Sequence, residues 1–209
     1  MNAINIVDGD EVVDVRLTNG NNEIILANRN GRAVRFDESA VRPMGRVSTG
    51  VRGMQLDGDD DQLVGMIIVN DAENETVMVV SENGYGKRSS VEDYRKTNRG
   101  GKGVKTIAVT EKTGRLVAIK NVTDENDLMI INKSGIAIRL AVRDCRVMGR
   151  ATQGVRLINL AKKNDVIASV CKVMSSELEE KVGEDEKLDD VETTSPDTIV
   201  ESTTDNNNQ

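Results

Sequence analysis

The feature of this 209-residue chain that most constrains its fold is an internal repeat. Three segments align without a gap: IILANRNGRAVRFDESAVRPMGRVSTGVRGMQL, VMVVSENGYGKRSSVEDYRKTNRGGKGVKTIAV and LMIINKSGIAIRLAVRDCRVMGRATQGVRLINL. Each carries a turn glycine, and nineteen residues later a second glycine; the pairs are Gly31 and Gly50, Gly84 and Gly103, Gly135 and Gly154. A period of about fifty residues predicts an array of similar units rather than one irregular domain.

Each repeat has the pattern of four short strands. Two apolar runs open it, as in Val12–Leu17 with Ile24–Ala27, and in Leu63–Val69 with Val77–Val80. Asn30-Gly31 and Asn83-Gly84 then favour a two-residue hairpin turn, because both residue types tolerate positive φ, and Ser134-Gly135 is a weaker form of this signal. A fourth strand is predicted after the second glycine, where apolar and polar residues alternate as around Met54. Four short strands per repeat are typical of a propeller blade.

The predicted fold is therefore all-β, a propeller-like repeat of four-stranded blades over residues 1–174. About three full blades are expected, at residues 8–57, 58–110 and 113–160, with partial units and a closing strand at 164–174. The segment Ile4–Val15 has the spacing of Ile158–Val170. We therefore expect the chain to begin inside the last strand of a missing unit, as the C-terminal piece of a longer protein.

The net charge of −7 conceals two regions of opposite sign. Residues 175–209 hold two lysines and twelve acidic residues, so residues 1–174 carry a net charge of +3. The acidic tail has few apolar residues and no periodicity, which predicts disorder, because it cannot bury enough surface to offset its ordering entropy. We expect the tail to compete with a polyanion for the cations of the body.

Positive charge recurs at fixed positions of the repeat. Counted from the turn glycine, the fourth, eleventh, fifteenth and twenty-first residues are basic in every copy: Arg35, Arg88 and Arg139; Arg42, Arg95 and Arg146; Arg46, Arg99 and Arg150; Arg52, Lys105 and Arg156. A single such residue, for example Arg35 between Val34 and Phe36, is explained by a solvated side chain opposite the core face. The recurrence, with acidic residues gathered elsewhere as in Asp57–Asp61, instead predicts a curved basic band.

A curved basic band suits duplex nucleic acid, which binds through phosphate neutralisation and counterion release. Aromatic residues make up only 1% of the chain, which argues against single strands, where base stacking carries much of the affinity.

Motifs for catalysis and metal binding are not matched. The glycine-rich stretch Arg99–Gly103 lacks the spacing of a phosphate-binding Walker A loop and the third glycine of a dinucleotide fingerprint, and it does not form a repetitive RNA-binding tract. The chain has no histidine and only two distant cysteines, and Asp57–Gln62 lacks the downstream glutamate of a calcium loop. We therefore expect no catalytic residue, metal or cofactor, and no apolar run is long enough to span a membrane.

The segments GRAVRFDESAVRPMGRVSTGVRGMQL, NGYGKRSSVEDYRKTNRGGKGVKTIAVTEKTG and MGRATQGVRLINL, followed by an acidic tail, resemble the C-terminal domain of bacterial DNA gyrase A. The resemblance implies a six-bladed β-pinwheel, in which neighbouring blades exchange strands and duplex DNA wraps around the basic rim. It also implies a cytoplasmic, chromosome-associated A2B2 holoenzyme with the rest of gyrase A and with gyrase B. That type II DNA topoisomerase would use ATP and Mg²⁺ elsewhere to introduce negative supercoils.

The glycine-rich box of that family, Gln-Arg-Arg-Gly-Gly-Arg/Lys-Gly, is matched in its last five positions by Arg99, Gly100, Gly101, Lys102 and Gly103. Lys102 thus joins the twelve repeated cations as a predicted DNA contact. Tyr85 and Tyr94 do not match the Arg-Tyr-Thr context of the family's nucleophile. Two alternatives stay open: the equivalent domain of topoisomerase IV, and a propeller that docks an acidic protein.

Overall fold

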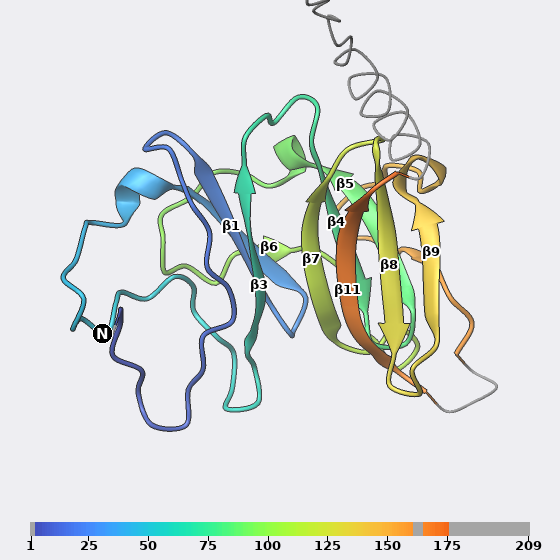
Figure 1. Ribbon diagram of the computed structural model, residues 1–209, viewed down its shortest axis with the longest axis horizontal. Coiled ribbons are helices and arrows are strands. Elements are labelled where there is room, and N and C mark those ends of the chain that lie inside the picture. Colours follow the sequence, from blue (N-terminus) through green and yellow to red (C-terminus); the bar gives the residue numbers. More distant parts are fainter. Residues whose placement is uncertain (1–2, 161–164, 176–209) are drawn as a thin grey trace, which may run out of the picture. The chain divides into compact units, whose positions relative to one another are not determined.

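The computed structural model describes residues 3–160 and 165–175 (Figure 1). Their regular structure consists of eleven β-strands and three short 3-10 turns, which confirms the all-β prediction. Among these residues no helix is long and apolar enough to cross a membrane. The predicted disordered tail lies outside the described residues except for Ser175.

The strands form three antiparallel sheets. The first has the order β3-β1-β2-β6, with bounds Leu63–Val69, Glu23–Asn28, Arg32–Asp37 and Val104–Lys105. The second has the order β10-β5-β4-β7, with bounds Val155–Arg156, Tyr85–Ser90, Thr76–Ser81 and Leu116–Val122. The third has the order β11-β8-β9, with bounds Ile167–Met174, Asn126–Asn132 and Ala137–Ala141. The 3-10 turns η1 (Glu38–Ala40), η2 (Val91–Asp93) and η3 (Val142–Asp144) follow β2, β5 and β9.

Neighbouring sheets exchange strands. β6 belongs to the second repeat in sequence but pairs with β2 of the first, where Val104 lies opposite Ala33. β10 of the third repeat pairs in the same way with β5 of the second, where Val155 lies opposite Gly86. This is the exchange that the resemblance to a β-pinwheel implied.

Sheet and sequence repeat do not share boundaries, which corrects the predicted strand assignment. The run Leu63–Val69 pairs with β1 and so completes the sheet of the preceding repeat, and Leu116–Val122 pairs likewise with β4. The predicted strand at Val12–Leu17 is wrong, because that segment forms no strand. The strand predicted after Gly50 is also not formed. A strand needs a row of partners for its backbone groups, and neither segment is paired into one of the three sheets in the described part of this chain.

The turn glycines shape the hairpins and anchor the exchanged segments. Gly31 has φ 76° and is the last residue of a four-residue turn, with its N–H donating to the Asn28 carbonyl at 3.1 Å. Three residues, 29–31, lie between the end of β1 and the start of β2, so the loop is one residue longer than the predicted two-residue form. The carbonyl of Gly31 accepts a hydrogen bond from the Thr106 N–H at 2.8 Å, and that of Gly84 accepts one from the Leu157 N–H at 2.8 Å. Each turn thus holds the segment that arrives from the next repeat.

The central strands are buried on both faces. In β4, Val77 and Val79 pack between the first and second sheets, whereas Met78 and Val80 pack between the second and third. Successive side chains of a strand point to opposite faces, so burial on both faces requires a continuous apolar run rather than alternation. Each fully buried aliphatic side chain contributes about 1.5–3 kcal/mol.

Replacing Gly103 with alanine is expected to weaken the junction between the first two sheets. A Cβ at Gly103 would lie 2.3 Å from the Ala33 carbonyl oxygen, whereas one at Gly50 would meet no atom within 4 Å, although both residues have positive φ. Gly50→Ala should cost about 1 kcal/mol through φ alone, and Gly103→Ala about 2 kcal/mol more through the clash. Urea unfolding measures both, and equal losses of unfolding free energy would contradict the proposed close approach.

Candidate nucleic-acid interface

The box segments, defined as residues 45–50, 98–103 and 149–154, link successive repeats. The second and third lie beside the segment that follows the second glycine of the preceding repeat. The Gln55 N–H donates to the Gly101 carbonyl at 2.9 Å, and at the equivalent position the Ala108 N–H donates to the Thr152 carbonyl at 3.2 Å. The glycine-rich stretch is therefore one link in a repeated backbone connection.

The arginines of the second and third box segments fasten this connection. Nε of Arg99 donates to the carbonyl of Ala40 at 3.0 Å, and its Nη1 donates to the carbonyl of Arg52. Arg150 makes the equivalent bonds, from Nε to the Asp93 carbonyl at 2.9 Å and from Nη1 to the Lys105 carbonyl at 2.8 Å. These guanidinium groups are half-buried and bind the preceding repeat.

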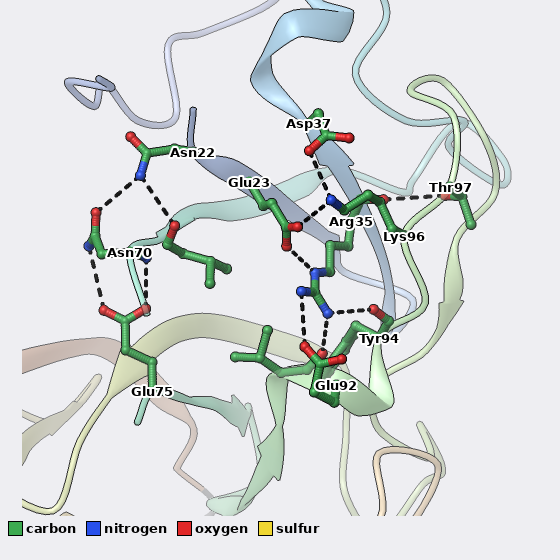
Figure 2. Close-up of polar contacts among 12 residues, drawn as sticks. Asn22, Glu23, Arg35, Asp37, Asn70, Glu75, Glu92, Tyr94, Lys96 and Thr97 are labelled. Atoms are coloured by element: carbon green, nitrogen blue, oxygen red, sulfur yellow. Dashed lines mark hydrogen bonds and ion pairs between the residues drawn. The ribbon is translucent and has the colours of Figure 1, made fainter. Parts of the chain in front are cut away.

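In the first two repeats the arginine four residues after the turn glycine is not solvated, contrary to the sequence interpretation. Arg35 is 7% exposed, and its guanidinium lies between the first hairpin and η2 (Figure 2). It donates to Glu23 Oε2 at 2.5 Å, to the carbonyls of Val91 and Tyr94 at 2.9 and 3.1 Å, and to Glu92 Oε1 at 3.1 Å. Burial raises the pKa of Glu23, but hydrogen bonds from Lys96 and Arg35 outweigh it and hold that pKa below its usual value.

Arg88 repeats this arrangement at the next junction. It is 5% exposed and donates to Thr76 Oγ1 at 3.1 Å, to Asp124 Oδ1 at 2.7 Å and to the Val142 carbonyl at 3.0 Å. Arg139 is only partly buried and donates to Asp127 Oδ2 at 2.8 Å. Arg35 and Arg88, predicted as DNA contacts, thus have their charge inside the protein, where a rigid fork of five donors satisfies carbonyls at the end of a 3-10 turn.

The sequence carries a signal for this internal role. Twelve residues before each of these arginines stands an oxygen-bearing side chain that accepts from it: Glu23, Thr76 or Asp127. A basic residue that recurs together with an oxygen-bearing side chain at a constant separation in the sequence indicates an internal contact. A basic residue that recurs without such a side chain indicates a surface charge.

The other repeated cations are exposed. Arg42, Arg95 and Arg146 each come two residues after a 3-10 turn, and Arg52 and Lys105 hold the twenty-first position. Their side chains and that of Lys102 make no hydrogen bond or ion pair with another described residue. Arg46 is exposed as well. This set presents net positive charge to solvent at the same positions of successive repeats.

Arg156 is exposed but engaged. Its guanidinium lies 5.5 Å from the centre of the Tyr85 ring, and Nη2 donates to the Tyr85 hydroxyl at 2.9 Å. Lys112 lies 5.5 Å from the same ring centre. The ring thus has two cations against it, and Tyr85 itself is buried.

Lys87 is a buried cation that sequence reasoning missed. It is 1% exposed, and Nζ donates to the Gly149 carbonyl at 2.8 Å, to the Arg150 carbonyl and to Thr152 Oγ1 at 3.3 Å. Burial lowers its pKa to about 8, and Asp93 and Arg150 are the charged groups that face it. Val34 and Ile138 hold the equivalent positions of the other repeats, so comparison of the registers could not reveal it.

Tyr94 and Asp61 have structural roles. Burial raises the pKa of Tyr94 to about 12, and its hydroxyl is hydrogen-bonded to Thr106 Oγ1. Asp61 of the acidic stretch is buried, and it accepts from Asn28 Nδ2 at 2.6 Å and from the Asp57 N–H at 2.9 Å. Within the ranges that the structure describes, no cluster of three or more metal-ligating side chains occurs.

Comparison with known proteins gives one family for the whole repeat array. The family model described as DNA gyrase C-terminal domain, beta-propeller, matches residues 22–70, 75–123 and 126–171, one match per sheet. DNA gyrase A of Staphylococcus aureus (strain NCTC 8325 / PS 47) is 45% identical over 185 residues, 88% of this chain and 20% of that protein. The chain therefore spans about a fifth of the length of these curated relatives.

Two solved structures are similar across the array. The C-terminal domain of DNA topoisomerase IV has a TM-score of 0.79 and 28% identity, covering 90% of this chain and 57% of that one. The DNA gyrase A C-terminal domain has a TM-score of 0.74 and 28% identity, covering 82% of this chain and 57% of that one.

Truncating a buried and an exposed arginine is expected to separate their roles. Arg35→Ala removes the buried donor that the Glu23 carboxylate and the carbonyls of Val91 and Tyr94 share, so the unfolding free energy should fall by about 3 kcal/mol. Arg42→Ala removes a solvated side chain and should change it by less than about 0.5 kcal/mol. Urea denaturation of both variants measures this, and a similar small effect for Arg35→Ala would refute its role at the junction.

Stability should depend on the protonation of Lys87. Because its folded pKa is lowered to about 8 from 10.5, the unfolded chain binds more protons between these values, and stability rises with pH through this window. Relative to Lys87→Met, the wild-type unfolding free energy should increase from pH 8 to pH 10.5 by up to about 3 kcal/mol. Denaturant titrations at several pH values test this, and a constant difference would show that the Lys87 pKa is not shifted.

Proposed function

Since the chain belongs to the family of DNA gyrase A C-terminal domains, we propose that it binds and wraps duplex DNA, largely independently of base sequence. The observation that carries the proposal is the recurrence of exposed cations at the eleventh and twenty-first positions of successive repeats. Equal positions in neighbouring blades give a row of similar contacts, which suits the regular phosphate backbone of a duplex.

The proposed contact set differs from the set predicted from sequence. It retains Arg42, Arg46, Arg52, Arg95, Lys102, Lys105, Arg146 and Arg156, which are exposed. Arg35, Arg88, Arg99 and Arg150 instead act by holding the blades in register. Arg139 is exposed, but it donates within the third sheet, to Asp127 and to the Met174 carbonyl. A Cβ at Gly100 or Gly101 would meet no protein atom nearer than 3.6 Å, so the space beside these two residues is open. Without side chains there, the backbone is accessible to close approach by DNA.

Aromatic side chains support a duplex rather than a single strand as the ligand. The chain has one phenylalanine, two tyrosines and no tryptophan, and Phe36, Tyr85 and Tyr94 are all buried. No aromatic ring of the chain is therefore presented to unpaired bases, whose binding depends on stacking. Bending 20–30 base pairs by 40–90° costs on the order of 1–6 kcal/mol, so contacts from several blades are needed to offset it.

The wider role follows by proposal from the relatives. The chain would act within an ATP-dependent type II topoisomerase holoenzyme, with the rest of gyrase A and gyrase B as partners and with catalysis, ATP and Mg²⁺ in other parts. The 45% identity to a DNA gyrase A favours gyrase, while the similar TM-scores keep the topoisomerase IV domain as the alternative. A protein-docking propeller would have no affinity for long duplex DNA.

Affinity for duplex DNA is expected to fall with salt. The slope of log affinity against log salt should be roughly −5 if about six phosphates are contacted, and Arg95→Ala should reduce its magnitude by about 1. Lys133→Ala is the matched control, because Lys133 is exposed but its register, shared with Arg29 and Glu82, does not keep one sign. Fluorescence anisotropy measures the slopes.

Wrapping is tested separately from binding. Resealing a nicked plasmid with ligase in the presence of the chain should change its linking number if DNA is wrapped. A salt slope near zero would refute DNA binding, and normal binding with an unchanged linking number would refute wrapping alone.

A further inference from the structure

A turn in the third box segment is held from the inside by the buried lysine of the preceding repeat. Residues 149–152 form this turn, in which the Thr152 N–H donates to the Gly149 carbonyl at 3.2 Å. Lys87, from β5, donates through Nζ to the Gly149 carbonyl at 2.8 Å and to the Arg150 carbonyl. Because Lys87 is buried, two successive carbonyl groups of the turn point into the protein.

The N–H groups of the same two peptides point the other way. In a trans peptide the C=O and N–H bonds are antiparallel, and no cis peptide bond occurs among the described residues. The Gly149 carbonyl shares its peptide with the Arg150 N–H, and the Arg150 carbonyl shares its peptide with the Ala151 N–H. Neither N–H donates to another residue of the described ranges, and Gly149 and Ala151 are exposed. The turn therefore presents two adjacent unused donors on the side away from Lys87.

The equivalent turn of the second box segment has the opposite orientation. At residues 98–101, the Gly100 N–H donates to the Gly53 carbonyl at 2.7 Å. Gly100 has φ 83°, the sign that a type II turn requires at its third residue, and type I and type II turns differ by a flip of the central peptide. Val34 stands at the position equivalent to Lys87 and has no donor for the turn carbonyls. The central peptide is thus flipped where the lysine is missing.

We propose that the turn at residues 149–152 binds a DNA phosphate through the N–H groups of Arg150 and Ala151, and that Lys87 is the positioning residue that keeps these groups outward. The inference rests on the proposed function and adds to it a backbone contact that the pattern of cations does not show. Successive backbone N–H groups in a turn form a concavity suited to an anion, and backbone N–H groups bind phosphates in DNA complexes.

The lysine acts through the turn and not on the phosphate itself. Its Nζ is occupied by the two carbonyls and by Thr152 Oγ1 at 3.3 Å, all of them on the protein side of the turn. The Lys87 side chain is 1% exposed, so its ammonium group offers no surface to DNA. An aliphatic residue at this position would leave the carbonyls of the turn without their shared donor.

The surroundings of the turn suit a phosphate. The Arg150 side chain reaches back to the preceding repeat, where Nε binds the Asp93 carbonyl and Nη1 binds the Lys105 carbonyl at 2.8 Å, so it does not engage the two N–H groups. The Lys105 side chain is exposed beside this contact, and Arg146, three residues before Gly149, is exposed as well. Both belong to the proposed contact set, so a duplex that meets them passes close to the turn.

Three variants separate orientation of the turn from stability of the junction. Ala151→Gly permits both orientations, because glycine takes either sign of φ, but Lys87 still selects the outward N–H groups. Lys87→Met removes the donor and keeps an aliphatic side chain, the type that Val34 and Ile138 supply at equivalent positions. Only the double variant has neither the lysine nor the alanine to oppose the flip.

Affinity for duplex DNA at fixed salt is therefore expected to respond non-additively. It should fall less than about 1.5-fold in Ala151→Gly, about threefold in Lys87→Met and about twentyfold in the double variant. Fluorescence anisotropy measures these losses. A double variant whose loss equals the product of the single losses would overturn the positioning role, because Lys87 would then act on the junction alone.

Amide hydrogen exchange of the full 209-residue chain, read by NMR, reports the orientation directly. In the free wild type the Ala151 amide should exchange rapidly and the Gly100 amide slowly. Saturation with a short DNA duplex should slow the Ala151 amide at least tenfold in the wild type but not in the double variant. Bound DNA with an unprotected Ala151 amide would overturn the inference and leave the proposed function standing, whereas a chain without affinity for DNA would overturn both.

Discussion

The hydrogen bond from an exchanged segment to the carbonyl of a turn glycine is the contact on which the rest of the array depends. It fixes the segment of one repeat against the hairpin of the preceding one, and it requires glycine on both sides. Gly31 must place its carbonyl in a turn with positive φ, and Gly103 must let two backbones approach without a Cβ between them. Because each repeat contacts only its neighbours, stability is then close to a sum of blade and junction terms.

The repeated arginines divide into two groups with different physical roles. Arg35 and Arg88 have their donors matched by carboxylate, hydroxyl and carbonyl oxygens, which makes burial of the charge tolerable. Arg42, Arg95 and Arg146 have no such partners among the described residues and keep their hydration. The first group holds neighbouring blades in a fixed register. That register places the second group at equal positions along the surface, so the proposed DNA contacts depend on the internal arginines.

The two groups also explain why the net charge of the chain is a poor guide to its ligand. The body carries only three more basic than acidic residues, but acidic side chains such as Glu23 and Asp127 are used to satisfy internal arginines. Positive and negative side chains at the surface are therefore more clearly separated by position than the net charge of the sequence indicates. A polyanion responds to that local charge, because exposed charges farther apart than about 8–10 Å are largely screened at physiological salt.

The sequence by itself determined the all-β repeat, the turn glycines and the cationic registers, because hairpins and charge patterns are local and recur at a fixed period. It also determined the family, through the box around Arg99–Gly103 and its sister segments. Only the tertiary structure decided that Leu63–Val69 closes the preceding sheet, that Val12–Leu17 forms no strand, and that Arg35 and Lys87 are buried. Each of these depends on which backbone edge or carbonyl group lies across a junction, and a residue some fifty positions away supplies that partner.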